Sequence, residues 1–216
     1  MKILALSDEV VESLYRPEIP ERFGDVDLVL GCGDLPFFYL EFMVTVLGKP
    51  LYYIHGNHDK PSQYLSDGRI ISRAEGCETV ESKAVRIPCT GGELLLAGLG
   101  GSIRYNEGPH QYTQAEMNQR LLRLIPTLLA NRALRGRYLD VLIAHAPPRG
   151  IHESGDHAHT GFDAFLTLMN RYRPRFLLHG HSHVYRNDAV TATRYKDTQV
   201  LNVYPYRLID FDKTYV

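Results

Sequence analysis

Residues 51–59, LYYIHGNHD, contain the pattern that decides the fold of this chain. Leu51–Ile54 is a short, continuous apolar run, which is typical of a strand covered on both faces. The run leads into a turn at Gly56, and three side chains able to bind a metal or move a proton follow it: Asn57, His58 and Asp59. A buried strand that ends in such side chains indicates an open α/β sheet, in which ligands bind beyond the carboxyl ends of the strands.

The same pattern follows four other apolar runs, which are Ile3–Leu6, Val26–Leu30, Val141–Ala144 and Phe176–Leu178. Together the five strand ends would bring six potential metal ligands into one crevice: Asp8, Asp34, Asn57, His145, His181 and His183. Glycines stand beside several of them, at Gly33, Gly56 and Gly180. Because glycine has no Cβ, these positions permit tight turns and a close approach of the backbone to a ligand.

Helical segments separate several of these strands. Pro36–Leu47 is apolar enough to form a largely buried helix, and Phe162–Tyr172 predicts another. Thr113 and Glu116 have the spacing of a capping box and begin a longer amphipathic helix, which we expect Pro126 to kink or split. The partly alternating stretch 189–211 predicts two or three strands of a meander. Strands that alternate with helices early and collect at the end predict a mixed α/β fold with two packed sheets.

Length and composition limit the class of protein. The chain has 216 residues, which predicts a single domain over 1–216. Its 24 basic and 25 acidic residues nearly cancel, so the charge does not favour a nucleic-acid partner. Three cysteines do not make a disulfide framework. No run approaches the ~18 apolar residues of a membrane helix. We therefore expect a soluble, cytoplasmic protein with no membrane partner.

The mixture of potential ligands indicates the chemistry. Carboxylates, an amide and imidazoles without a thiolate suit Mn, Fe or Zn, with Mn favoured. One carboxylate can bridge two ions, and two ions ~3.5–4 Å apart can hold a phosphate and stabilise the leaving oxygen of an in-line displacement. Positioning and charge neutralisation are what phosphate ester hydrolysis needs most. The sequence therefore predicts one or two divalent metal ions and a phosphoric ester hydrolase.

Five motifs also appear in a familiar order: Asp8, GCGD at 31–34, GNHD at 56–59, HAPP at 145–148 and GHSH at 180–183. In this order they resemble the motifs of the calcineurin-like metallophosphoesterase family. The resemblance covers nearly the whole chain. It implies a four-layer αββα sandwich, in which two packed β-sheets are flanked by helices.

The resemblance also implies roles for individual residues. Asp34 would bridge the two ions, with Asn57, His145 and His181 on the second ion and Asp8 and His183 on the first. His58 would not bind metal but would act near the phosphate, as a general acid or as a stabilising cation. Asp59 would orient His58 by accepting its other N–H.

The chain departs from the family pattern at Val10. The family has Asp-x-His at the first strand, whereas this chain has Asp8-Glu9-Val10, and a valine side chain cannot coordinate a metal. Losing an inner ligand should cost at least about 10–100-fold in affinity for the first ion. Either water or a nearby side chain completes the shell, or the first site stays empty at ordinary metal concentrations. The nearby candidates are Glu9, His152, His157 and His159.

These observations predict a phosphodiesterase or phosphomonoesterase that works through attack by a metal-bound hydroxide. A small phosphate ester or a nucleotide-like molecule is the expected substrate, and a diester is preferred because compact members of the family often act on diesters. Arg104, in a Gly-rich turn, and His157, in the loop 147–161, are predicted substrate contacts, although both segments also suit a solvated loop. The alternative is a low-activity or inactive metal- and nucleotide-binding regulatory protein. A nuclease is disfavoured by the near-neutral charge.

Overall fold

The structure is a computed structural model that describes residues 1–64, 68–89, 92–184 and 188–215. It contains four helices within those ranges: α1 (Ile19–Phe23), α2 (Phe37–Leu47), α3 (Gln114–Arg135) and α4 (Asp163–Tyr172). The strands are β1 (Lys2–Leu6), β2 (Leu28–Cys32), β3 (Leu51–Ile54), β4 (Gln63–Tyr64), β5 (Ile70–Ile71), β6 (Glu78–Thr79), β7 (Lys83–Cys89), β8 (Gly92–Leu99), β9 (Ser102–Ile103), β10 (Gln111–Tyr112), β11 (Val141–Ala144), β12 (Phe176–His179), β13 (Ala192–Tyr195), β14 (Thr198–Asn202) and β15 (Tyr206–Asp210).

Two large sheets form the centre of the molecule. The first has the order β15-β1-β2-β3-β6, and the second has the order β13-β14-β12-β11-β8-β7. In the first sheet β1, β2, β3 and β6 run parallel, and only the edge strand β15 is antiparallel to its neighbour. In the second sheet β8, β11, β12 and β14 run parallel, between antiparallel edge strands β7 and β13. Parallel strands end at the same edge, so the central strands of each sheet bring their carboxyl ends together.

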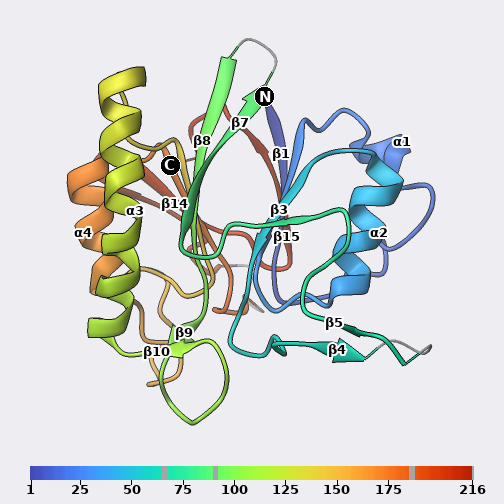
Figure 1. The fold of residues 1–216 in the computed structure, drawn as a ribbon, viewed down its shortest axis with the longest axis horizontal. Helices are drawn as coiled ribbons and strands as arrows, with labels where there is room; N and C mark the ends of the chain where they lie inside the picture. Colours follow the sequence, from blue (N-terminus) through green and yellow to red (C-terminus); the bar gives the residue numbers. More distant parts are fainter. Residues whose placement is uncertain (65–67, 90–91, 185–187, 216) are drawn as a thin grey trace.

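Helices cover the outer face of each sheet. Figure 1 shows α1 and α2 on one side of the paired sheets and α3 and α4 on the other. Side chains alternate between layers: Ile3 packs between the two sheets with Ile143, whereas Leu4 packs toward Tyr39 of α2. On the opposite side Leu142 packs in the cluster that holds α3 and α4. The predicted four-layer αββα sandwich is confirmed. Since both faces of each sheet are covered, the central strands are continuous apolar runs.

Local predictions agree with the structure at most helix boundaries. Thr113 caps α3 with the predicted capping box: its side chain accepts from the Glu116 amide, and the Glu116 side chain accepts from the Thr113 amide. The predicted split at Pro126 is wrong, because α3 is one helix through that residue. Proline has no amide N–H, so the Leu122 carbonyl lacks its helical partner at Pro126. Both residues are exposed, so water can donate to that carbonyl.

The predicted C-terminal meander is only partly correct. Three strands form, and β13 and β14 make an antiparallel pair. However, β14 pairs in parallel with β12 in the second sheet, whereas β15 crosses to the edge of the first sheet and pairs with β1. The segment 203–205 makes this crossing. The Ser7 amide donates to the Pro205 carbonyl, and the Val203 amide donates to the His179 carbonyl. The C-terminal strands thus tie the two sheets together beside β1 and β12.

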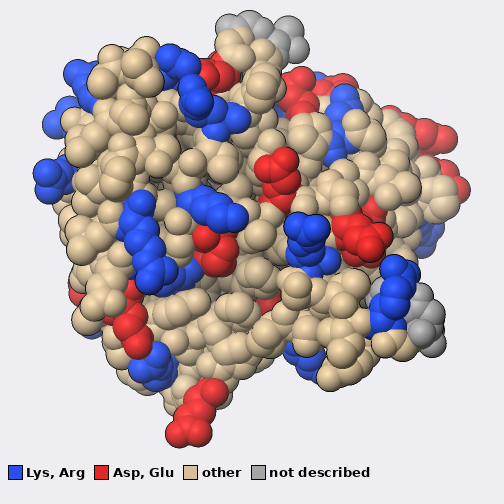
Figure 2. All heavy atoms as spheres, viewed as in Figure 1, with Lys and Arg blue, Asp and Glu red and all other residues tan. Residues whose placement is uncertain are grey.

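The surface carries no sign of a dominant charge on the viewed face. Figure 2 shows Lys and Arg side chains interspersed with Asp and Glu there, as the nearly equal numbers of acidic and basic residues lead one to expect. Among the described residues, no helix combines the length and the apolar character that crossing a membrane requires.

Candidate metal centre

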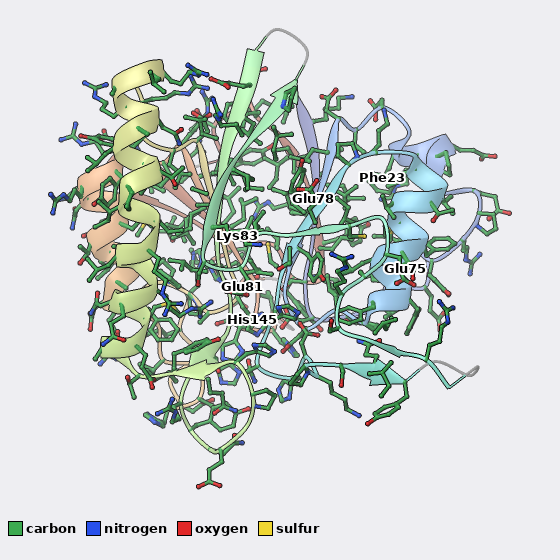
Figure 3. The ribbon with its side chains drawn as sticks, in the orientation of Figure 1. Phe23, Glu75, Glu78, Glu81, Lys83 and His145 are labelled. Atoms are coloured by element: carbon green, nitrogen blue, oxygen red, sulfur yellow. The ribbon has the colours of Figure 1, made fainter. Side chains whose placement is uncertain are left out.

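The turns that follow five strands meet at one edge of the sandwich. Asp8 follows β1, Asp34 follows β2 and His145 follows β11, and one potential ligand atom from each lies within 4.8 Å of those of the other two. His145 comes from the second sheet and the two aspartates from the first, so the site lies where both sheets end. In Figure 3 His145 lies toward the end of the molecule that carries β4, β5, β9 and β10. The convergence predicted from the sequence is therefore present for these three residues.

Three of the predicted ligands have a left-handed backbone. Asp8 has φ 67°, Asp34 has φ 55° and His181 has φ 63°. This region is unfavourable for residues other than glycine, and such residues concentrate at functional sites where the surrounding structure enforces them.

Two glycines make room for the aspartate ligands. A Cβ on Gly56 would overlap Asp34 Oδ1, and a Cβ on Gly180 would overlap Ser7 Oγ and Asp8 Oδ2. Any side chain at either position would displace the carboxylate beside it. The close backbone approach predicted for these glycines is confirmed, and it explains why both motifs need glycine immediately before their functional residues.

The hydrogen bonds of His145 show which nitrogen faces the site. Its Nδ1 lies 2.9 Å from the Cys32 carbonyl oxygen, which can only accept, so Nδ1 carries a proton. Its Nε2 lies 3.0 Å from Asn57 Oδ1 and 3.2 Å from Asp34 Oδ2. A nitrogen that faces two acceptor oxygens needs a positive charge between them, supplied by a proton or by a metal ion. A metal-binding histidine typically donates its other N–H to a carbonyl in this way, so the donor set fits a divalent cation.

The pKa values of the metal-free site also indicate a positive charge between His145 and the carboxylates. Burial by itself lowers the pKa of His145, but the carboxylates of Asp34 and Asp8 outweigh burial and raise that pKa to about 10. Burial opposes ionisation of Asp34 too, yet the His145 charge and hydrogen bond hold the pKa of Asp34 well below its usual range. Without a metal, a proton on His145 therefore offsets part of the charge of the two carboxylates. A divalent cation competes with that proton.

Asn57 is held by a residue that the sequence did not single out. Its Nδ2 donates to the Tyr105 hydroxyl at 3.0 Å, which turns its Oδ1 toward His145 Nε2. Asn57 is 3% exposed, so water cannot replace this partner easily. Tyr105 lies in the loop between β9 and β10, and its place in the Gly-rich segment after β8 is the one signal that could have indicated it.

His181 lies against the ring of His145, with 4.9 Å between the ring centroids. Its Nε2 donates to the Ala158 carbonyl at 2.9 Å, which leaves Nδ1 as the nitrogen with a free lone pair. Burial, with a contribution from His145, lowers the pKa of His181 to about 3, so the ring is neutral and able to coordinate. The His181 amide also donates to both Asp8 oxygens, at 3.1 and 3.0 Å, and so fixes that carboxylate.

His183 reaches the other side of Asp8, with 3.4 Å between His183 Nε2 and Asp8 Oδ1. This hydrogen bond raises the pKa of His183. The Tyr204 ring stacks on His183 with 4.5 Å between centroids, and the Tyr204 hydroxyl donates to Glu9. Glu9 therefore points to Tyr204, and Val10 packs against the cluster that holds α1 and α2.

His58 and Asp59 lie at the same turn but differ in role. The His58 amide donates to Asp34 Oδ1 at 2.8 Å, while its imidazole is exposed at a cavity of about 520 Å³. The prediction that Asp59 accepts from the His58 ring is not met among the described residues. Instead Asp59 Oδ2 accepts from the amides of Asp34 and Gly56, at 2.9 and 2.8 Å. Burial raises the pKa of Asp59 to about 6, with the Asp34 charge adding to the shift and the Gly56 amide opposing it.

The two predicted substrate contacts, Arg104 and His157, lie in loops that follow β9 and β11. The Arg104 guanidinium binds both oxygens of Glu116, at 2.9 and 2.8 Å, and so belongs to the first turn of α3. His157 is exposed in the loop after β11. In the same loop the His159 ring lies 4.6 Å from that of His181, and His159 Nδ1 lies 2.8 Å from Asp156. His152 pairs with His179 at 2.8 Å.

Comparisons with known proteins found a matching sequence model and structures with a similar fold. A sequence model described as "Calcineurin-like phosphoesterase" matches residues 2–185. No curated protein matches the chain. The crystal structure of TT1561 of Thermus thermophilus has a TM-score of 0.64 at 15% identity, over 97% of this chain and 94% of that one. A second crystal structure has a TM-score of 0.63 at 16% identity, over 98% of this chain and 99% of that one. At these identities the likeness concerns the fold.

Proposed function

The chain belongs to the calcineurin-like phosphoesterase family, and on that basis we propose that it is a metal-dependent hydrolase of phosphate esters. Membership of the family implies metal-dependent phosphoester hydrolysis. The observation that supports this activity most directly is the position of His145 Nε2, which faces oxygens of Asn57 and Asp34 at 3.0 and 3.2 Å. Such a nitrogen among oxygens at the end of two sheets is suited to a divalent cation.

The ligand sets that we propose are those that the family resemblance implies, and the grouping of Asp8, Asp34 and His145 supports them. Asp34 lies between the two halves of the site and would bridge two ions. His145, Asn57 and His181 would hold the second ion, and Asp8 and His183 the first. Manganese is the favoured metal, because this set contains oxygen and imidazole donors and no thiolate. Divalent ions bound there would supply positive charge to the phosphoryl oxygens and would acidify a bound water.

His58 would act on the leaving group. Its amide is tied to Asp34 at 2.8 Å, so the imidazole is carried on a turn that is fixed relative to the proposed bridging ligand. The exposed ring can reach an ester oxygen and donate a proton to it as that oxygen departs. Asp59 would contribute indirectly, because it holds the amides of Asp34 and Gly56 and thereby the shape of the turn.

The substrate that we propose is a small phosphate ester or nucleotide-like molecule, with a phosphodiester favoured. We also propose a cytoplasmic location, because the three cysteines are all free.

The test combines metal content with turnover. The protein is stripped with a chelator and reloaded with Mn²⁺, and hydrolysis of p-nitrophenyl phosphate and bis(p-nitrophenyl) phosphate is measured. We expect turnover that depends on Mn²⁺ and is lost in Asp34→Asn. Asp212→Asn is the matched control, since Asp212 is a 79% exposed carboxylate that pairs with the N-terminus. Turnover equal to that of Mn²⁺ in buffer, for both esters, would overturn the proposal.

One observation supports the alternative of a low-activity regulatory protein that binds a metal and a nucleotide. Val10 occupies the position of a family ligand, and Glu9 points to Tyr204, while His152 pairs with His179. The first ion would then rely on Asp8, Asp34 and His183, with water, His157 or His159 left to complete its shell. This alternative predicts one metal per chain and nucleotide binding without turnover, even at high Mn²⁺.

A further inference from the structure

A cavity of about 520 Å³ opens beside the proposed metal centre, on the side of His58. Its inner wall includes Asp34, His58 and Asp59, and its outer wall includes Phe38, Lys60 and Tyr64. This volume lies within the range of about 300–1,000 Å³ that small-molecule sites occupy, and it is large enough for a nucleotide. A phosphate held at Asp34 would place its ester oxygen near His58, so the leaving group would extend into this cavity.

The outer wall exposes two aromatic rings. Phe38 is 50% exposed in the first turn of α2, and Tyr64 is 79% exposed at the end of β4. An exposed apolar patch rimmed by polar residues is typical of a ligand-binding groove. The Phe38 ring is supported from behind by Tyr15, with the ring centroids 5.8 Å apart in an edge-on arrangement. A planar ring is the group that such walls hold best.

The same cavity offers positive charge. Lys60 follows the turn that carries His58, is exposed, and forms no ion pair within the part of the chain that the structure describes. The nearby carboxylates, Asp34 and Asp59, are already bound to backbone amides, those of His58 for Asp34 and of Asp34 and Gly56 for Asp59. An ammonium group beside aromatic walls favours a ligand that has both a ring and a negative group.

We propose that Phe38, Tyr64 and Lys60 form the leaving-group subsite, and that it takes a nucleotide-like ester whose leaving group carries a planar ring and a negative charge. This inference rests on the proposed function, because it assigns one side of the same site. The ring would stack on Phe38 and Tyr64, and the negative group would pair with Lys60.

The experiment measures competitive inhibition of Mn²⁺-dependent p-nitrophenyl phosphate hydrolysis by three compounds: adenosine 5′-monophosphate, ribose 5-phosphate and inorganic phosphate. The first two compounds differ in the adenine base, so their inhibition constants compare binding with and without a planar ring. Inorganic phosphate measures binding at the metal centre alone. We expect the monophosphate to bind about tenfold more tightly than ribose 5-phosphate. Phe38→Ala and Tyr64→Ala should remove most of that difference while leaving inhibition by inorganic phosphate unchanged. Phe38→Leu keeps apolar bulk without the ring, so it should retain only part of the difference in affinity between the two compounds.

Lys60→Met tests the charge. It should weaken binding of adenosine 5′-diphosphate, which has the additional negative group, more than that of the monophosphate. Leu134→Ala and Lys83→Met serve as controls, because both residues are exposed and neither lines the cavity.

The two proposals fail in different ways. If the wild-type protein hydrolyses esters but the monophosphate and ribose 5-phosphate inhibit equally, or Phe38→Ala leaves their ratio unchanged, the subsite is wrong and the hydrolase stands. If the metal-loaded protein hydrolyses no ester, the hydrolase is wrong. In that case calorimetry measures the affinities for adenosine 5′-monophosphate and ribose 5-phosphate directly. Their ratio, in wild type and in Phe38→Ala, still decides whether the rings bind a base.

Discussion

Replacing Tyr105 with phenylalanine removes one hydroxyl and tests how the Asn57 ligand is oriented. The Tyr105 hydroxyl accepts from Asn57 Nδ2 at 3.0 Å, and Asn57 is 3% exposed. Tyr105→Phe therefore leaves a buried amide N–H without a partner. The amide then either tolerates the loss or rotates to find another acceptor, and rotation would turn Oδ1 away from His145 Nε2.

The magnitude follows from the burial. A buried donor left without a partner costs about 1–3 kcal/mol. At about 1.4 kcal/mol per tenfold change, this corresponds to about 5- to 150-fold in the dissociation constant of the ion that Asn57 holds. The range contains the effect of about 10–100-fold that is usual when a partner of a metal ligand is lost. We therefore expect Tyr105→Phe to weaken the second ion by about tenfold or more, and to lower folding stability by about 1–3 kcal/mol where the buried N–H stays unpaired.

The assay is calorimetric titration of the metal-free protein with Mn²⁺, followed by turnover at saturating and limiting metal. Activity should recover at high Mn²⁺, because the hydroxyl acts through Asn57. Tyr112→Phe is the control, since Tyr112 belongs to the adjoining strand β10 and its ring lies under Arg120 at 4.0 Å. If Tyr105→Phe binds Mn²⁺ within twofold of wild type, the argument about amide orientation is refuted.

Three further predictions concern protonation, the first ion and the glycines. Because the pKa of His145 is raised from 6.5 to about 10 in the folded protein, its protonation stabilises the metal-free fold below pH 6.5, and that stability is lost as the pH rises toward 10. The melting temperature in chelator should fall over this range for wild type and less for His145→Gln; parallel curves would contradict the assignment. Val10→His should raise the affinity of the first site for Mn²⁺ by about tenfold or more. Val11→His, in the same cluster, should leave that affinity unchanged. Equal Mn²⁺ stoichiometry and affinity in the two variants would show that another group completes the shell. Gly180→Ala should destabilise the protein by about 1–3 kcal/mol in chemical denaturation, because the added carbon would overlap Ser7 and Asp8; an unchanged unfolding midpoint would contradict the overlap.

Much of the fold follows from local pattern. The runs Leu51–Ile54 and Val141–Ala144 are strands with those bounds, and Thr113 starts a helix as its capping box predicts. The strand β7, Lys83–Cys89, was not predicted, because it is an edge strand with charged residues and a proline. The crossing of β15 to the first sheet was not predicted either. Alternation in a sequence indicates a strand but does not say which neighbour it will pair with.

In the candidate site, too, the sequence indicates what a residue can bind but not which neighbour it contacts. Asp8, Asp34 and His145 were predicted as ligands, and the structure brings them together. Arg104 has the chemistry of a phosphate contact, yet Glu116 lies close enough to bind it instead. Asp59 was predicted to hold a side chain and holds backbone amides. Side-chain chemistry limits what a residue can bind, whereas its neighbours in space decide what it does bind.

The amino-acid sequence alone determined the order of the five strand ends that carry potential ligands, the kinds of atom that could hold a metal, and the valine in place of a ligand, because periodicity and residue type are local properties. The tertiary structure decided which nitrogen of His145 faces the site, that Tyr105 orients Asn57, and that Phe38, Lys60 and Tyr64 share one cavity. These contacts join residues far apart in the chain, and they depend on how two sheets pack at their carboxyl ends.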